Sequence, residues 1–263
     1  MSVIISVVNN KGGVGKTTVT CNLSHALAKK GKKVLVVDID SQCNATSLLI
    51  PDTAALRYSM YDILESENNT TPEKCIYGTE YANLYCLPNI PDTASLEPEL
   101  IYRSPKSLFT LRKKFRDYAL ENFEITIIDN PPNMGTFVIC SLYCSDFVIV
   151  PNQAGSSFSL EGLLKAIMLI NEVREQGNPN LRFLRLLINQ VDKRTTISRA
   201  TITQIKQNFK PDQFFITTIP INTAFQQAES LKQTIFKFSP HAAGARAYRL
   251  LAQELLEILD NQA

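Results

Sequence analysis

No long hydrophobic run interrupts the 263 residues of this chain. The first apolar segment, residues 3–8, is far shorter than the roughly 20 apolar residues that cross a bilayer as a helix, and no basic segment precedes it. The sequence therefore predicts neither a signal peptide nor a membrane span. We expect a protein of the cytosol.

Patterns that bind zinc or form disulfides are also missing. The six cysteines form no CxxC pair, and no histidine lies at zinc-ligand spacing from them. Both absences argue against a zinc site and against a disulfide framework. Because most of the cysteines lie in apolar stretches, we expect reduced, structural thiols; they are Cys21, Cys43, Cys75, Cys86, Cys140 and Cys144.

Repeats and low-complexity segments are absent as well, and apolar runs alternate with segments that have apolar residues three and four positions apart. Such alternation is typical of an α/β fold with a mostly parallel sheet covered by helices on both faces. We expect one domain over residues 1–263, in which residues 51–105 form loops and short helices at one edge. The predicted strands are residues 3–8, 33–40, 83–89, 124–130, 146–152, 182–189 and 213–220, and the predicted helices are residues 17–30, 107–121, 160–175, 197–209 and 242–259.

Charge is unevenly spread along the chain. The formal net charge is only +2, yet residues 193–249 contain nine Lys or Arg against two acids, which gives +7 there and −5 elsewhere. A basic segment of this kind indicates either a polyanionic partner or a solvated face. Charge alone leaves both interpretations open.

A glycine-rich loop, KGGVGKTT at residues 11–18, follows the first predicted strand and opens the first predicted helix. In this context the pattern predicts a phosphate-binding loop, because glycines let backbone N–H groups close around phosphate oxygens and the helix N-terminus adds its positive end. Lys16 is expected to reach the β- and γ-phosphates, and the Thr17 hydroxyl to ligate Mg²⁺. The predicted nucleotide contacts of the loop are Lys11, Gly12, Gly13, Val14, Gly15, Lys16, Thr17 and Thr18.

The loop departs from the usual Gly-x-x-x-x-Gly-Lys-Ser/Thr spacing, because Asn10 stands where the first glycine belongs and Lys11 follows it. In this form it resembles the deviant Walker A motif of the ParA/MinD family. The resemblance implies a P-loop NTPase fold, ATP and Mg²⁺ as ligands, and a homodimer with ATP sandwiched between two chains. Lys11 would then reach the nucleotide of the second subunit, where an extra cation neutralises charge that develops during phosphoryl transfer.

Two further segments resemble the same family. VVDIDSQCNAT at residues 36–46 carries two carboxylates, and the resemblance implies that Asp40 orients the attacking water and Asp38 supports the metal. ITIIDNPPNMG at residues 125–135 implies that Asp129 holds Mg²⁺ and that the turn after it senses the γ-phosphate. Without the phosphate loop, two carboxylates one residue apart at a strand end would also suit a solvated turn.

A third segment, NQVDKRT at residues 189–195, resembles the family's base-side loop. Asn189 is thus a candidate adenine contact, and Pro220 a candidate wall for the ring. Both residue types are also common as simple turn residues at strand ends. NQVD is loosely similar to the guanine-reading N-K-x-D pattern, but the rest of the chain matches users of ATP.

Family members that bind DNA carry arginines in the last third of the chain, and most of these positions are altered here. Ile221, Ala224 and Ala243 occupy three of them, and Arg194 keeps a fourth. The change argues against DNA binding. The local basic charge argues for it, because phosphate contacts depend on charge more than on side-chain placement. We predict weak, salt-sensitive, non-specific DNA binding by Lys206, Lys210, Lys232, Lys237, Arg246 and Arg249.

Two other branches of the family are disfavoured. Membrane-bound relatives end in a basic amphipathic helix, whereas no Lys or Arg follows Arg249 here and three acids, Glu254, Glu257 and Asp260, do. An anionic membrane would repel this tail, so we expect no membrane partner. The iron–sulfur carriers need a bridging CxxC, which the chain lacks.

Together, these features predict an ATP-driven dimeric switch that positions or segregates a plasmid, a chromosome or a protein assembly. A ParB-like or other activating partner would stimulate hydrolysis, and DNA binding would associate the protein with the nucleoid in the cytoplasm. Two alternatives stay open. One is a nucleotide-dependent adaptor with little hydrolysis, which Ser41 in place of proline and Asn130 after Asp129 favour. The other is a metabolic ATP-dependent enzyme on the same fold.

Overall fold

The computed structural model describes residues 2–65, 69–154 and 159–262. A seven-stranded sheet with the order β3-β4-β2-β5-β1-β6-β7 runs through this part of the chain. Neighbouring strands are parallel, except that β3 runs antiparallel to β4. The strands are β1 Val3–Val7, β2 Val34–Asp38, β3 Tyr77–Gly78, β4 Leu84–Leu87, β5 Ile125–Asp129, β6 Phe147–Gln153 and β7 Arg182–Asn189.

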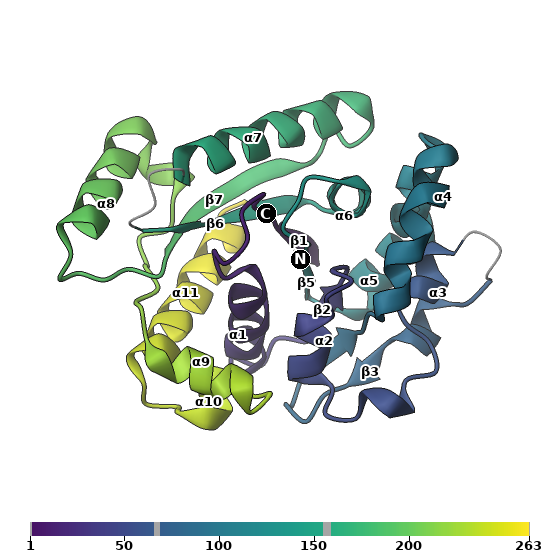
Figure 1. Ribbon diagram of the computed structural model, residues 1–263, viewed down its shortest axis with the longest axis horizontal. Coiled ribbons are helices and arrows are strands. Elements are labelled where there is room, and N and C mark those ends of the chain that lie inside the picture. Colours follow the sequence, from purple (N-terminus) through teal and green to yellow (C-terminus); the bar gives the residue numbers. More distant parts are fainter. Residues whose placement is uncertain (1, 66–68, 155–158, 263) are drawn as a thin grey trace.

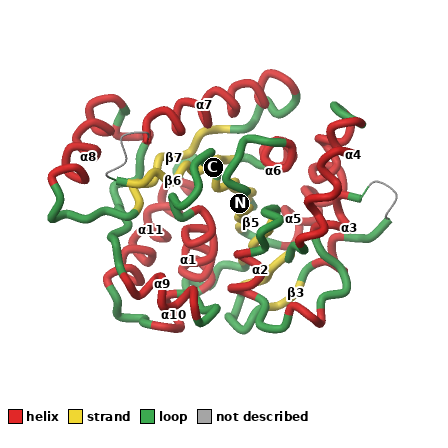
Figure 2. Tube along the Cα trace, viewed as in Figure 1, coloured by secondary structure: helices red, strands yellow, loops and turns green. Residues whose placement is uncertain are grey.

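Helices cover both faces of the sheet (Figures 1 and 2). The buried side chains of strand β1 pack against the helices on both faces of the sheet. Val3 and Ile5 belong to the core cluster with α1 and α11, and Ile4 belongs to the cluster with α3, α5 and α6. The helices are α1 Lys16–Ala28, α2 Asn44–Leu49, α3 Met60–Leu64, α4 Glu97–Tyr102, α5 Asp117–Asn122, α6 Thr136–Cys144, α7 Ser159–Gln176, α8 Thr196–Asn208, α9 Thr223–Ser230, α10 Ile235–Phe238 and α11 Ala243–Asp260.

The sheet confirms the expected α/β class, and six predicted strands are present as β1, β2, β4, β5, β6 and β7. Four predicted helices are confirmed as α1, α7, α8 and α11. The fifth, over residues 107–121, is helical but irregular, because a π-helix at Arg112–Arg116 separates a 3₁₀ turn from α5. Residues 51–105 contain the expected short helices, and also the unpredicted strand β3. All six cysteines are buried and free, as expected.

The strand predicted for residues 213–220 is wrong. This segment forms only isolated parallel bridges, from Phe214 to Leu186 of β7 and from Pro220 to Val191, just after β7. The backbone N–H of Phe215 donates to Leu186 O, and that of Ile219 donates to Ile188 O. Between these two hydrogen bonds this segment advances by four residues, whereas β7 advances by only two. The extra residues turn outward, and the Glu254 carboxylate of α11 accepts hydrogen bonds from the N–H groups of residues 216 and 217 at 2.6 and 2.9 Å. Hydrogen bonds to a side chain distant in sequence therefore replace the hydrogen bonds to a neighbouring strand at these two residues.

Candidate nucleotide-binding site

The loop between β1 and α1 lies at the carboxyl edge of the sheet, where parallel α/β sheets bind ligands. Two of its glycines, Gly13 and Gly15, have positive φ angles of 75° and 86°. Gly15 is the N-cap of α1, and its left-handed conformation turns the chain into the helix. The first N–H groups of α1 have no acceptor within the helix and carry its positive end. This part of the chain therefore has the geometry of an anion site.

Three side chains outside the glycine motif hold this loop. Asn9 is buried; its amide donates to Pro151 O at 2.8 Å, and its Oδ1 accepts from the Lys11 N–H at 3.0 Å. From the end of β7, Asn189 Nδ2 donates to Val14 O and Gln190 Nε2 donates to Gly13 O, each at 2.7 Å. Sequence reasoning missed Asn9 and Gln190, because only the folded chain brings their partners to them.

The two lysines of the loop occupy different environments. Lys16 is 7% exposed and lines the cavity next to the loop. Its Nζ donates to Lys11 O at 3.1 Å. Burial lowers the pKa of Lys16, and the negative charges of Asp129 and Asp40 partly oppose this shift. Lys11 is not one of the described residues that line the cavity.

Asp38 and Asp129 lie side by side, because β2 and β5 pair in a register that matches them. Both are fully buried. Asp129 accepts hydrogen bonds from the hydroxyls of Thr17 and Thr20 at 2.7 and 3.1 Å, so it is joined to the first turns of α1. Burial raises the pKa of Asp129, and the neighbouring charge of Asp38 raises it further.

Asp38 is held by the start of α2. Thr46 donates both its backbone N–H and its hydroxyl to Asp38 Oδ2 at 2.8 Å, and the N–H of Asp40 donates to Asp38 Oδ1 at 3.1 Å. Burial raises the pKa of Asp38 despite the Thr46 hydrogen bonds. Asp40 is 6% exposed and lines the cavity. Neither carboxylate is thus a solvated turn residue.

The metal ligands expected from the sequence come together only in part. Thr17 and Asp129 are in direct contact, whereas Asp38 is held in place by Thr46. Across the described residues, no three His, Cys, Asp or Glu side chains converge on a common metal position. Mg²⁺ commonly binds through one or two protein oxygens together with waters and substrate phosphates. The Thr17–Asp129 pair beside the anion site fits such an ion.

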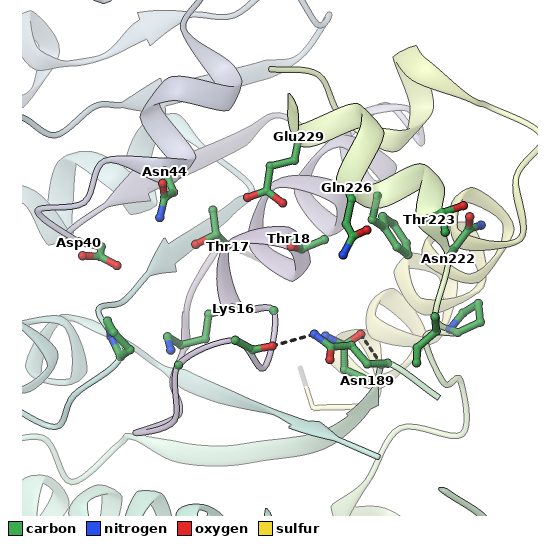
Figure 3. Close-up of a pocket in the computed structure, with 18 residues that line it drawn as sticks. Lys16, Thr17, Thr18, Asp40, Asn44, Asn189, Asn222, Thr223, Gln226 and Glu229 are labelled. Carbon is green, nitrogen blue, oxygen red and sulfur yellow. Dashed lines mark hydrogen bonds between the residues drawn. The ribbon is translucent and has the colours of Figure 1, made fainter. Parts of the chain in front are cut away.

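A cavity of about 480 Å³ opens above the loop. Figure 3 shows Asp40 on one side of it, Gln226 on the opposite side and Lys16 between them. Asn189, an expected base contact, lies on the side away from Asp40, and Pro220, the other expected base contact, also lines the cavity. Sequence reasoning missed the contribution of the segment around α9 to the lining of the cavity, which comprises Ile221, Asn222, Thr223, Phe225, Gln226 and Glu229.

Asp192 and Asn130 lie near the site in sequence, but both form hydrogen bonds within the protein. Both Asp192 carboxylate oxygens accept hydrogen bonds from Arg194, and Asp192 is not one of the described cavity-lining residues. This arrangement gives no support to guanine reading by NQVD. Asn130 is fully buried, donates to Val7 O at 3.3 Å and accepts from the Ser141 hydroxyl at 2.6 Å. It therefore connects β5 with β1 and α6.

Seven of the nine basic residues among residues 193–249 fall into two groups; of the other two, Arg194 pairs with Asp192, and Lys232 is exposed after α9. Lys237 pairs with Glu80, while Arg246 and Arg249 donate to the carbonyls of residues 241 and 240. A second group is exposed on or beside α8, a helix without acidic residues; it comprises Lys193, Arg199, Lys206 and Lys210. Of the positions where arginine is usual, Ala224 is buried, and Ile221 and Ala243 are exposed.

None of the helices within the described ranges combines the length and the apolar character needed to cross a membrane. The sheet, the glycine-rich loop with its lysine, and the carboxylates at adjacent strand ends define a P-loop nucleotide-binding protein.

The comparison with known proteins gives the family. Residues 2–183 match the family described as an AAA domain. The chain is 34% identical over 255 residues to the sporulation initiation inhibitor protein Soj of Bacillus subtilis, covering 97% of this chain and 98% of that protein. It is also 34% identical over 252 residues to the chromosome-partitioning ATPase Soj of Thermus thermophilus, covering 96% and 94%. The chain belongs to the ParA/MinD family of P-loop ATPases.

Solved structures agree with this assignment. The cell division ATPase MinD of Pyrococcus furiosus has a TM-score of 0.80 at 25% identity, covering 98% of this chain and 100% of that chain. Cobyrinic acid a,c-diamide synthase of Mycobacterium smegmatis, with bound ADP and magnesium, has a TM-score of 0.83 at 27% identity, covering 100% and 97%. The fold is thus shared by a cell division ATPase and a biosynthetic enzyme.

Proposed function

We propose that the protein is an ATP-dependent partitioning or positioning switch that dimerises around its nucleotide. One observation carries the proposal: of the two lysines in the phosphate loop, Lys16 lines the loop's own cavity and Lys11 is not one of the described residues that do. One lysine suffices to hold the phosphates of the bound ATP. The second has a role if it reaches the nucleotide of another subunit.

Different groups of the chain bind different parts of ATP. The loop N–H groups and the Lys16 ammonium bind the phosphates, and the cavity side with Asn189 and Pro220 receives the adenine. Thr17 and Asp129 would hold Mg²⁺ directly or through water, with Asp38 behind them. When bound, Mg²⁺ neutralises phosphate charge and polarises the phosphoryl oxygens.

Asp40 is the proposed orienting group for hydrolysis. It lines the cavity, and its Oδ1 accepts a hydrogen bond from the Gln42 N–H at 3.0 Å, which fixes the carboxylate. A carboxylate fixed in this way can hold a water for attack on the γ-phosphate, and the products are ADP and phosphate. Intrinsic turnover is expected to be slow, because a switch must persist in its ATP state until an activating partner protein stimulates it.

Size-exclusion chromatography with ATP and Mg²⁺ tests the dimer. We expect wild type and Asp40→Ala to elute as dimers, with turnover lost in Asp40→Ala. Lys11→Ala should bind ATP and remain a monomer, and Lys16→Ala should not bind ATP, because its charge lies against the triphosphate. A nucleotide-loaded wild type that stays monomeric at high concentration would contradict the switch.

We further propose that residues 1–263 act as one domain, and that the ATP-bound dimer binds DNA weakly and without sequence preference. This would place it on the nucleoid in the cytoplasm. The exposed, acid-free α8 supports the DNA proposal, with Arg199 and Lys206 on the helix and Lys210 beside it. A gel shift with ATP at low salt should show retention that disappears at high salt. No retention at low salt would contradict the proposal that the dimer binds DNA.

A biosynthetic ATP-dependent enzyme is the second candidate, because the chain shares its fold with the Mycobacterium smegmatis synthase over the whole length of the chain. Product analysis separates the two functions. A switch releases only ADP and phosphate from ATP, whereas a synthetase needs a second substrate that becomes amidated or ligated. An adaptor that never hydrolyses would release no phosphate even with its activating partner.

A further inference from the structure

We propose that the consecutive amides of Asn189 and Gln190 are positioning residues that orient two phosphate-binding N–H groups of the loop. This inference rests on the proposed nucleotide site and assigns a task within it that the motif itself does not reveal. The two side chains leave the end of β7 and donate to consecutive carbonyls, Val14 O and Gly13 O, each at 2.7 Å. We call this pair of hydrogen bonds the amide clamp.

The planar peptide bond explains what the amide clamp does. In a trans peptide the C=O of one residue and the N–H of the next point in opposite directions. Holding Gly13 O toward Gln190 therefore turns the Val14 N–H away from Gln190, and holding Val14 O toward Asn189 turns the Gly15 N–H away from Asn189. Within the described chain, neither N–H donates to a protein acceptor. Neither donor is therefore occupied by the described protein, and Gly15 lines the cavity in which an anion would bind.

Glycine peptides need this restraint more than others. Gly13 has a φ of 75°, and a Cβ there would meet nothing within 4 Å, so neither a side chain nor close packing fixes its peptide. A free peptide at this position can rotate its N–H out of the anion site at little steric cost. The Gln190 amide removes this freedom before the ligand arrives, which lowers the entropy lost on binding.

Forming the amide clamp costs backbone free energy. Gln190 adopts a left-handed φ of 53°, which costs a non-glycine residue free energy and is typical of functional positions. Asn189 is buried, and its Oδ1 accepts the Gln190 N–H at 2.9 Å, so the first side chain also fixes the backbone of the second. The Asn189 carboxamide still has a second N–H, so a base contact by the same residue is compatible with the clamp.

Gln190→Met tests the amide clamp, because methionine keeps the length of the side chain and loses the donor. Gln190→Asn is the second variant: asparagine tolerates the left-handed backbone but is one methylene too short for the same hydrogen bond. Gln207→Met, on the exposed surface of α8, is the matched control. Urea unfolding of each ligand-free variant verifies that it is folded.

Affinities are measured by displacement of a fluorescent ATP analogue with ATP, tripolyphosphate and adenosine. We expect both Gln190 variants to bind ATP and tripolyphosphate roughly fivefold to tenfold more weakly, by the same factor, as the loss of one hydrogen bond predicts. Adenosine affinity and the Gln207→Met control should not change.

Two results would overturn the amide clamp while leaving the nucleotide site intact. In the first, the Gln190 variants lose affinity for ATP and adenosine but not for tripolyphosphate, which would make Gln190 a base contact. In the second, no affinity changes. If wild type bound neither ATP nor tripolyphosphate, the proposed function would fail and the clamp with it.

Discussion

The two glycines with left-handed backbone in the phosphate loop permit a paired test of how the loop is held. Alanine at Gly13 would face open space, because a Cβ there meets nothing within 4 Å. Alanine at Gly15 would place its Cβ 2.5 Å from Asn189 Nδ2, too close for both atoms to stay. The two substitutions thus share the same backbone strain and differ in one contact.

The size of each effect follows from this geometry. A left-handed alanine costs about 1–2 kcal/mol, and the loss of glycine's freedom in the unfolded chain returns about 0.4–1 kcal/mol. We therefore expect Gly13→Ala to lower the free energy of unfolding by about 1.6 kcal/mol at most. In Gly15→Ala the buried Asn189 must also leave Val14 O, and an unsatisfied buried carbonyl costs a further 1–3 kcal/mol, roughly. The expected total is about 1–4.6 kcal/mol.

Equilibrium urea unfolding of the ligand-free protein, followed by far-ultraviolet circular dichroism, measures both variants. Equal slopes would show that the denatured state is unchanged, so that the midpoints report stability. In Gly15→Ala combined with Asn189→Ala, the close contact is gone, and the two changes should cost less together than the sum of their separate effects. If the two glycine substitutions destabilised the protein equally, the contact between Asn189 and the loop would have no energetic role.

Three further predictions concern charged and titrating groups. Because burial raises the pKa of Asp129 to about 8, ligand-free stability should fall as pH rises from about 4 to about 8; Asp129→Asn should flatten this slope in urea unfolding, and an unchanged slope would contradict it. Burial lowers the pKa of His25 to about 4, so stability should be lost as pH falls from about 6.5 to about 4, and His25→Gln should remove this loss. Arg116→Ala breaks a largely buried pair with Asp146 and should lower the free energy of unfolding by about 1–3 kcal/mol, whereas no measurable change in the urea midpoint would show that the pair is not stabilising.

Much of the sheet could be predicted from sequence, because its buried parallel strands are apolar on both sides. The residues of β2, for example, are all buried, so the whole strand reads as one apolar run that ends in a carboxylate. The segment after α8 is also apolar, yet it does not form a strand. Two of its N–H groups, those of residues 216 and 217, are taken by Glu254, a residue about forty positions away, and no local pattern indicates such a partner.

The residues of the candidate site also differ in how far the sequence alone predicts them. Lys16 and Thr17 lie in one continuous motif, so their spacing alone placed them at the phosphate loop. Asn9 is next to that motif, but its role depends on Pro151, on the neighbouring strand β6. Gln190 depends in turn on Gly13. Contacts between strand ends are set by the order of strands in the sheet, which a single sequence leaves open.

The pairing of β2 with β5 places two buried carboxylates at this edge, an arrangement that suits the proposed ligand site better than a stable core. It brings Asp38 and Asp129 together, and their ionisation is opposed by burial and by each other. Each carboxylate also holds a threonine at the start of a helix, Thr17 of α1 and Thr46 of α2. A cation that stabilised the ionised pair would therefore tighten both helices at once, so that ligand occupancy and the stability of this edge of the sheet are necessarily coupled.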